Sequence, residues 1–303
     1  MLAGLVIRTK QSLMANLKEV KQRINSVMST QQITKAMKMV SAAKLRRAQE
    51  KIVQMRPYSQ KLTAILNNVS ASSEGDSDIV FGAKREVKKV LLVPITSDKG
   101  LCGAFNTNIL KATNTSIKEQ FPGVEISILP IGKKSYEYYK KLDYTLVDTY
   151  FGMYQQLSFD VVKEAATFAM NGFLTGNYDQ VVLVFNEFKN VATQVVRVEQ
   201  FLPMAPQEVE SASPAETDYL LEPSRTYIIE ELVPISLRIQ FYKAVLESNA
   251  SEHGARMTAM DKATENAGEL LKELKLMYNR TRQAAITNEI LEIVAGANAL
   301  AGK

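Results

Sequence analysis

The end of the chain, from Ile235 to Lys303, contains no proline. Apolar and small residues recur there at alternating spacings of three and four, which is typical of a helix in a left-handed coiled coil. The pattern predicts one very long helix, which at about 1.5 Å of rise per residue would extend roughly 100 Å. A helix of that length exceeds a small domain and needs a partner.

The predicted contact seam of this helix keeps a strict heptad spacing. Its members are Met257, Met260, Thr264, Ala267, Leu271, Leu274, Tyr278, Thr281 and Ala285. After Ala285 the spacing shifts by one residue, and apolar residues occur on nearly all sides of the helix. These tip residues are Ile286, Ile290, Leu291, Ile293, Val294, Ala297 and Leu300. A helix that is apolar all round is expected to be enclosed, here by other chains.

A partner for this helix is predicted at the other end of the sequence. Residues 1–56 also lack proline and place apolar residues at Leu17, Val20, Ile24 and Val27, then at Ile33, Met37 and Val40. Two such helices can pair antiparallel. A capping-box spacing at Ser29–Gln32 leaves a short break as an alternative. Pro57 either ends or kinks the helix, whose end is expected between Arg56 and Ser72.

Positive charge is concentrated in the first helix. Residues 14–56 hold ten Lys or Arg and two acidic residues, a balance of +8, whereas the whole chain carries +5. The densest basic section contains Lys35, Lys38, Lys44, Arg46, Arg47 and Lys51. Such a helix favours an acidic partner, although a solvated surface is an equal alternative. Nucleic acid fits poorly, because no aromatic residue lies between residues 1 and 57 to stack on bases.

The middle of the sequence predicts an α/β domain with a mainly parallel sheet. A buried strand is expected at Val87–Ile95, and further strands at Val124–Pro130, Gln180–Phe185 and Val191–Phe201. Helices are expected after Phe105, at Lys133–Leu142 and at Leu157–Thr175. Residues 71–83 are expected to form a linker rich in Ser, Gly and Asp. Residues 203–223, rich in Pro, Glu and Ser, are expected to be an exposed connection. The second long helix then starts near Ile228 or after Pro234.

A glycine-rich segment, Ser97–Asn106, joins the first strand to its helix, which is the usual position of a phosphate-binding loop. Its spacing does not fit the nucleotide motifs, because Lys99 precedes Gly100 instead of following the last glycine. A tight turn with close backbone packing is favoured. A nucleotide-binding α/β enzyme that uses this loop stays an alternative.

The sequence gives little support for other catalytic sites or for metal sites. The chain has one cysteine, Cys102, and one histidine, His253, which excludes an internal disulfide and cysteine clusters and disfavours histidine dyads. We expect His253 to be solvated or at an interface. No catalytic residue, cofactor site or metal site is expected. No apolar run approaches the roughly 18 residues that a membrane-spanning helix needs, so we expect a soluble or peripheral protein.

The predicted fold class is therefore α/β, with two long terminal helices forming an antiparallel coiled coil and flanking a central Rossmann-like α/β domain. We expect an N-terminal shaft helix at 1–70, a globular domain at 71–227 and a C-terminal shaft helix at 228–303. Residues 1–13 have Arg8 and Lys10 but no acidic residue, which weakly suggests a transit peptide. We favour an extension that precedes a start at Met14.

Three stretches carry a resemblance to a known family: residues 17–49, the segment TSDKGLCGAFN at 96–106, and residues 251–300. From Met14 onward the chain resembles the gamma subunits of rotary F-type ATP synthases. The resemblance implies a central rotor shaft inside a ring of three alpha and three beta subunits. It also implies contacts with epsilon and with the ring of membrane c subunits, so that proton flow drives ATP synthesis or ATP hydrolysis drives proton pumping.

The same resemblance implies roles for individual residues. Arg282, Gln283 and Thr287 become candidates for hydrogen bonds with a beta-subunit loop, whereas the apolar tip would form a bearing. Met37 and the basic residues Lys35, Lys38, Lys44, Arg46 and Arg47 would face the acidic carboxyl-terminal lever of beta. Cys102 has no partner for the thiol switch of plant chloroplast gamma subunits.

The resemblance also implies a location and leaves rivals to test. We expect a peripheral position on the cytoplasmic face of a bacterial plasma (inner) membrane, held through the complex without insertion. The matrix face of the mitochondrial inner membrane is the alternative. Besides the nucleotide-binding enzyme, a basic coiled-coil module for nucleic acid or an anionic membrane remains a rival function.

Overall fold

The computed structural model describes residues 2–71, 80–83, 85–204 and 225–301. The chain divides into two compact units. Unit 1 combines Met1–Met39 with Ala259–Lys303, and unit 2 is Val40–Thr258. Both ends of the chain therefore belong to unit 1, and the sheet belongs to unit 2.

Two long helices form the ends of the described chain. Helix α1 spans Leu2–Ala71 and helix α5 spans Arg225–Ala301. α1 continues without a break through Ser29–Gln32 and past Pro57, so the alternative of a break is wrong. α5 likewise contains Pro234 and begins before it. The predicted division into three domains stays a prediction.

In unit 1 the predicted seam of α5 is confirmed. Its members from Met260 to Ala285 are buried or half-buried, and so are Val20, Ile24 and Val27 on α1. Across the pair, Lys38 Nζ lies 2.6 Å from Asp261 Oδ1, and Thr264 Oγ1 donates a hydrogen bond to Thr34 Oγ1 at 2.8 Å. Thr34 of α1 contacts Thr264 of α5, and Lys38, later in α1, contacts Asp261, earlier in α5. The two helices therefore run antiparallel.

In the second half of the predicted α1 seam Met37 is half-buried, but the prediction is wrong for Ile33 and Val40. Ile33 and Val40 are 59% and 56% exposed, whereas the polar residues Thr34 and Ser41 are buried. The observed positions Gln31, Thr34, Lys38 and Ser41 continue the heptad that begins at Val20. Gln31 and Thr34 can occupy such positions because they donate hydrogen bonds to backbone carbonyls, and Lys38 because it pairs with Asp261. Hydropathy alone therefore selected the wrong face.

Unit 2 contains a five-stranded sheet in the order β3-β2-β1-β4-β5. Its strands are β1 Lys89–Pro94, β2 Glu125–Ile128, β3 Thr145–Leu146, β4 Gln180–Phe188 and β5 Gln194–Leu202. The first four run parallel and β5 pairs antiparallel with β4. β1 is almost entirely apolar because both faces of a parallel sheet are covered. The predicted α/β class is confirmed, but the very short β3 was missed.

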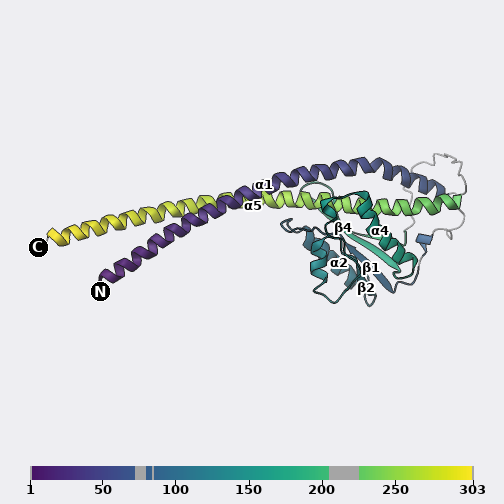
Figure 1. Cartoon of the computed structure of the whole chain (residues 1–303), viewed down its shortest axis with the longest axis horizontal. Helices are drawn as coiled ribbons and strands as arrows, with labels where there is room; N and C mark the ends of the chain where they lie inside the picture. Colours follow the sequence, from purple (N-terminus) through teal and green to yellow (C-terminus); the bar gives the residue numbers. More distant parts are fainter. Residues whose placement is uncertain (1, 72–79, 84, 205–224, 302–303) are drawn as a thin grey trace. The chain divides into compact units, whose positions relative to one another are not determined.

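Helices cover both faces of the sheet. α2 (Phe105–Glu119) packs Phe105 and Ile109 against Val90 and Leu92, on the face near α3 (Lys133–Tyr139). α4 (Phe159–Leu174) covers the other face together with the Val233–Val245 part of α5 (Figure 1). Ser158 caps α4 by accepting a hydrogen bond from Val161 N.

The two predicted connections are only partly within the described residues. The first, 71–83, includes a 3-10 turn, η1 (Val80–Gly82), in which Phe81 is buried. Of the second, 203–223, only Pro203 and Met204 are described, and Met204 N donates to Phe81 O at 2.9 Å. Residues 72–79 and 205–224 lie outside the described residues. A second 3-10 turn, η2 (Met153–Gln155), precedes α4.

Gly132, at the start of α3, is expected to be irreplaceable. Its φ is +90°, and a Cβ there would lie 2.1 Å from the backbone oxygen of Thr96. Gly132→Ala should lower the free energy of unfolding by at least about 3 kcal/mol, measured by urea denaturation. Gly123→Ala is the control, since its φ is +76° and nothing lies within 4 Å of the added Cβ. That control should cost about 1 kcal/mol, and equal losses would refute the steric explanation.

Candidate functional site

The predicted tip of α5 is exposed in this chain. Ile286, Ile290, Leu291 and Val294 are all exposed, and Ile293 is 71% exposed. Ala297 is exposed as well, and Leu300 lies outside the residues whose side chains are described. Large apolar side chains grouped at one helix end are typical of a surface that another protein covers.

The three predicted polar contact residues lie at the boundary between the paired part of α5 and this tip. Arg282, Gln283 and Thr287 are exposed. Thr287 Oγ1 donates to the carbonyl of Gln283 at 3.0 Å, one helical turn earlier. The Arg282 guanidinium and the Gln283 amide thus extend from one short stretch of helix and offer directional hydrogen bonds.

The predicted basic residues differ in their surroundings. Lys35 is exposed in unit 1, whereas Lys38 is partly covered by its ion pair with Asp261. Met37, also in unit 1, is half-buried. In unit 2, Lys44, Arg46 and Arg47 are exposed, and Arg46 Nε lies 3.1 Å from Glu50 Oε1. The exposed cations are available to an acidic partner, but Lys38 also serves the helix pair.

Hydrogen bonds within the chain hold the glycine-rich loop in place. The Ser97 N–H donates to Asn106 Oδ1 at 2.9 Å, and the Asn106 amide donates to Cys102 Sγ at 3.1 Å. Asp98 accepts hydrogen bonds from Lys133 N at 2.9 Å and Gly152 N at 3.1 Å. These bonds join the loop to the start of α3 and to Gly152 within the chain. The favoured interpretation as a packed turn fits this geometry.

Sequence reasoning missed a buried ion pair beside this loop. Arg256 of α5 pairs with Glu252, and its Nη2 donates to the carbonyls of Lys99 at 3.0 Å and Gly100 at 3.3 Å. Burial raises the pKa of Glu252, and the neighbouring Arg256 charge opposes that shift. The i,i+4 spacing of Glu252 and Arg256 was the available signal.

His253 is buried at 9% exposure, so of the two expected alternatives, solvated or at an interface, the solvated one is wrong. Burial, then the charges of Arg256 and Lys44, lower its pKa from 6.5 to about 4. Below pH 6.5 the unfolded chain binds this proton while the folded chain does not. The contribution of His253 to the free energy of unfolding should therefore be fully present above pH 6.5 and be lost as the pH drops toward 4.

The histidine contribution can be isolated by comparing pH 7 with pH 4.5. Folded wild-type chain should lose about 2 kcal/mol more between these values than a His253→Leu variant does. Urea unfolding at both pH values measures this. An identical loss in the two proteins would show that His253 does not titrate as its burial implies.

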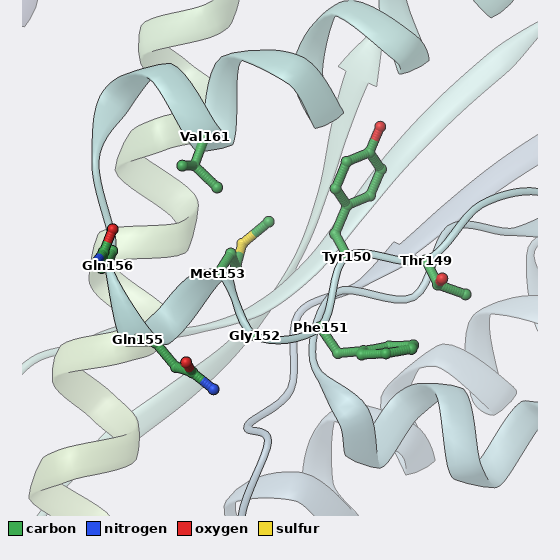
Figure 2. A pocket seen from close by; sticks show the side chains of 8 residues that line it. All are labelled: Thr149, Tyr150, Phe151, Gly152, Met153, Gln155, Gln156 and Val161. Atoms are coloured by element: carbon green, nitrogen blue, oxygen red, sulfur yellow. The ribbon is translucent and has the colours of Figure 1, made fainter.

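A surface cavity of about 350 Å³ lies in unit 2 beside the loop that follows β3. Figure 2 shows its lining, in which Met153 and Val161 approach each other while Tyr150 and Phe151 point in different directions. Burial and then the Asp148 charge raise the pKa of Tyr150 to about 12, so the phenol stays neutral near pH 7. The lining side chains carry no charge.

Two searches of the described residues bear on membranes and metals. No group of three or more His, Cys, Asp or Glu side chains among these residues is arranged to hold a metal ion. Likewise, none of the helices in the described ranges has both the length and the apolar character needed to cross a bilayer.

Comparison with known proteins places this geometry in a family. The family model described as ATP synthase matches residues 16–300. The ATP synthase gamma chain of Cytophaga hutchinsonii is 57% identical over 293 residues, covering 95% of this chain and 99% of that protein. The gamma chain of Flavobacterium psychrophilum is 52% identical over 290 residues, covering 95% and 100%.

Solved structures agree. A chain in the central stalk and c-ring structure of the Tetrahymena thermophila mitochondrial ATP synthase is 27% identical, with a TM-score of 0.57 over 76% of this chain and 99% of that chain. A chain of the Euglena gracilis mitochondrial enzyme is 23% identical with a TM-score of 0.67 over 94% of this chain and 95% of that chain, which supports the fold. By its matched length and its relatives, the chain belongs to the ATP synthase family, among the gamma chains.

Proposed function

We propose that the chain is the central rotor shaft of a proton-translocating F-type ATP synthase. It couples rotation of the c-ring to conformational change at the catalytic sites of the beta subunits. The chain itself is a non-catalytic subunit. The observation that carries the proposal is the near full-length identity to bacterial ATP synthase gamma chains.

The exposed tip of α5 suits a bearing inside a ring of alpha and beta subunits. Apolar contacts are non-directional, so their energy changes little as one surface turns against another. Directional hydrogen bonds from Arg282 and Gln283 instead favour particular angles. Their position next to the tip supports a role in contact with a beta-subunit loop, with Thr287 as a third member.

The exposed cations of α1 support contact with an acidic lever on beta. Lys35, Lys44, Arg46 and Arg47 are exposed, and Met37 and Lys38 lie on the same helix. Complementary charge guides association and registration more than it adds raw affinity. These residues therefore supply coupling between rotor angle and beta conformation.

The remaining partners are epsilon and the c-ring. Through them the chain associates with the membrane without entering it, at the cytoplasmic face of a bacterial plasma membrane. The bacterial relatives, at 57% and 52% identity, support this location over a mitochondrial matrix. The two rival functions have less support, because hydrogen bonds within the chain close the glycine loop and Lys38 pairs with Asp261.

Co-purification tests the proposal directly. An affinity tag on this chain in its source organism should recover alpha, beta, epsilon and c subunits from detergent-solubilised membranes, identified by mass. Recovery of the chain without alpha and beta would contradict the proposal. Saturable micromolar ATP binding to the isolated chain would favour the nucleotide-binding rival.

A further inference from the structure

The sheet of unit 2 reverses its strand order between β1 and β4. β2 and β3 follow β1 on one side, and β4 lies on the other side. In open α/β sheets, ligands bind in the crevice at the carboxyl ends of the strands where the order reverses. The ends of β1 and β4 therefore define the place where a ligand would be expected.

In this chain a segment of α5 lies in that place. The Ser248 hydroxyl donates to the carbonyl of Ile95 at 3.1 Å, one residue after β1 ends. The Ser251 hydroxyl donates to the carbonyl of Asn186 at 3.0 Å, near the end of β4. Both serines are buried. Helical serines thus satisfy strand carbonyls at the reversal point.

Charged residues of the same segment extend these contacts. Glu247 Oε2 accepts a hydrogen bond from Phe188 N at 3.1 Å, the last residue of β4. Further along the helix, Arg256 holds two carbonyls of the loop after β1 and pairs with Glu252. All three charged residues are buried. Buried charges that are paired and hydrogen-bonded fix geometry, because moving them apart leaves an uncompensated charge.

We propose that the segment Glu247–Arg256 of α5 fills the position at the strand-order reversal where a ligand would otherwise bind. Within it, Arg256 and Glu252 are positioning residues that fix the angle of α5 about its own axis. Apolar packing alone resists such a turn weakly because it is non-directional. The hydrogen bonds of Arg256 lie away from the helix axis and must break if α5 turns against the sheet. Resting on the proposed rotor function, they are the contacts through which torque passes between the sheet and α5.

Amide hydrogen exchange on the full chain provides the first test. Arg256→Met should make exchange in residues 97–103 faster by about tenfold or more, because the loop loses two hydrogen bonds and Glu252 loses its partner. Arg197→Met is the matched control, since it breaks an exposed pair with Glu187 in the same unit. Exchange in β1 should stay unchanged in both. Unchanged exchange at 97–103 would overturn the proposal.

The second test measures protons pumped per ATP hydrolysed in the assembled complex. Arg256→Met should lower this ratio severalfold, whereas Arg256→Lys, which keeps the charge, should restore part of it. A purely structural role would lower hydrolysis and pumping together through less complex, and that outcome would refute a positioning role.

Both tests can still be made if the Arg256→Met variant does not fold. If Arg256→Met fails to fold, the double variant Glu252→Gln/Arg256→Met removes both charges and takes its place. It should show the same faster loop exchange and lower ratio, and a wild-type result in it would count against the proposal. Absence of the wild-type chain from the complex would instead defeat the rotor function, and the exchange result would stand separately.

Discussion

Replacing Lys35, Arg46 and Arg47 together by glutamate is expected to lower proton-driven ATP synthesis by about a hundredfold. The three substitutions change the local charge from +3 to −3. Against an acidic lever of beta, this sets like charges opposite each other, which costs several kcal/mol. A free-energy change of about 1.4 kcal/mol corresponds to a factor of ten in an equilibrium constant, so a cost of about 3 kcal/mol accounts for a hundredfold loss.

The structure determines this choice of residues. Lys38 is left intact because it pairs with Asp261, and Lys44 because its charge acts on His253 and Glu252. The Arg46–Glu50 pair is exposed, and losing an exposed ion pair costs a folded chain little. The isolated variant should therefore unfold almost like wild type.

ATP synthesis in reconstituted vesicles is the measurement. Glutamate at Lys111, Lys118 and Lys163 gives the same charge change on exposed positions of unit 2 and serves as the control. Glutamine at Lys35, Arg46 and Arg47 separates lost attraction from added repulsion and should show a smaller defect. Normal synthesis by the glutamate variant would refute the contact with an acidic lever.

Removing the directional contacts beside the tip should also have a large effect. Arg282→Ala is expected to lower ATP synthesis about tenfold or more, because a hydrogen bond involving a charged group contributes about 1.5–3 kcal/mol. Gln283→Ala removes a neutral amide and should lower synthesis less, because an ordinary hydrogen bond contributes about 0.5–1.5 kcal/mol. Both side chains are exposed in the isolated chain, and alanine favours helix. The free energy of unfolding should therefore change by less than about 0.5 kcal/mol.

Arg280→Ala provides the matched control. It removes the same kind of side chain from an exposed position on α5, two residues earlier, and so from a different side of the helix. Synthesis should be close to wild type in this control. If Arg282→Ala and Arg280→Ala behave alike, the proposed beta-loop contact at Arg282 is wrong.

The fold was largely predictable where burial is apolar. The heptad from Met260 to Ala285 and the buried strand β1 follow directly from hydrophobic spacing. The α1 seam failed at Ile33 and Val40 because the actual seam continues through Gln31, Thr34 and Ser41. A hydroxyl pair such as Thr34 and Thr264 stabilises a contact that hydropathy does not register.

The candidate site likewise includes residues that could be predicted from the sequence and residues that could not. The tip and its polar neighbours were predicted from spacing and family resemblance, and stay predictions until partners are observed. The buried contacts of Ser248, Ser251 and Arg256 could not be predicted, because they depend on which strands meet at the reversal point. His253 was misjudged for the same reason: its neighbours come from distant parts of the sequence.

Single-molecule rotation tests the central claim most directly. A probe attached at Lys111→Cys, in a Cys102→Ser background, would report the angle of this chain in a complex immobilised through its beta subunits. During ATP hydrolysis the probe should turn in one direction, with one pause per beta subunit in each revolution. ATP hydrolysis at the normal rate with a stationary probe would contradict the account.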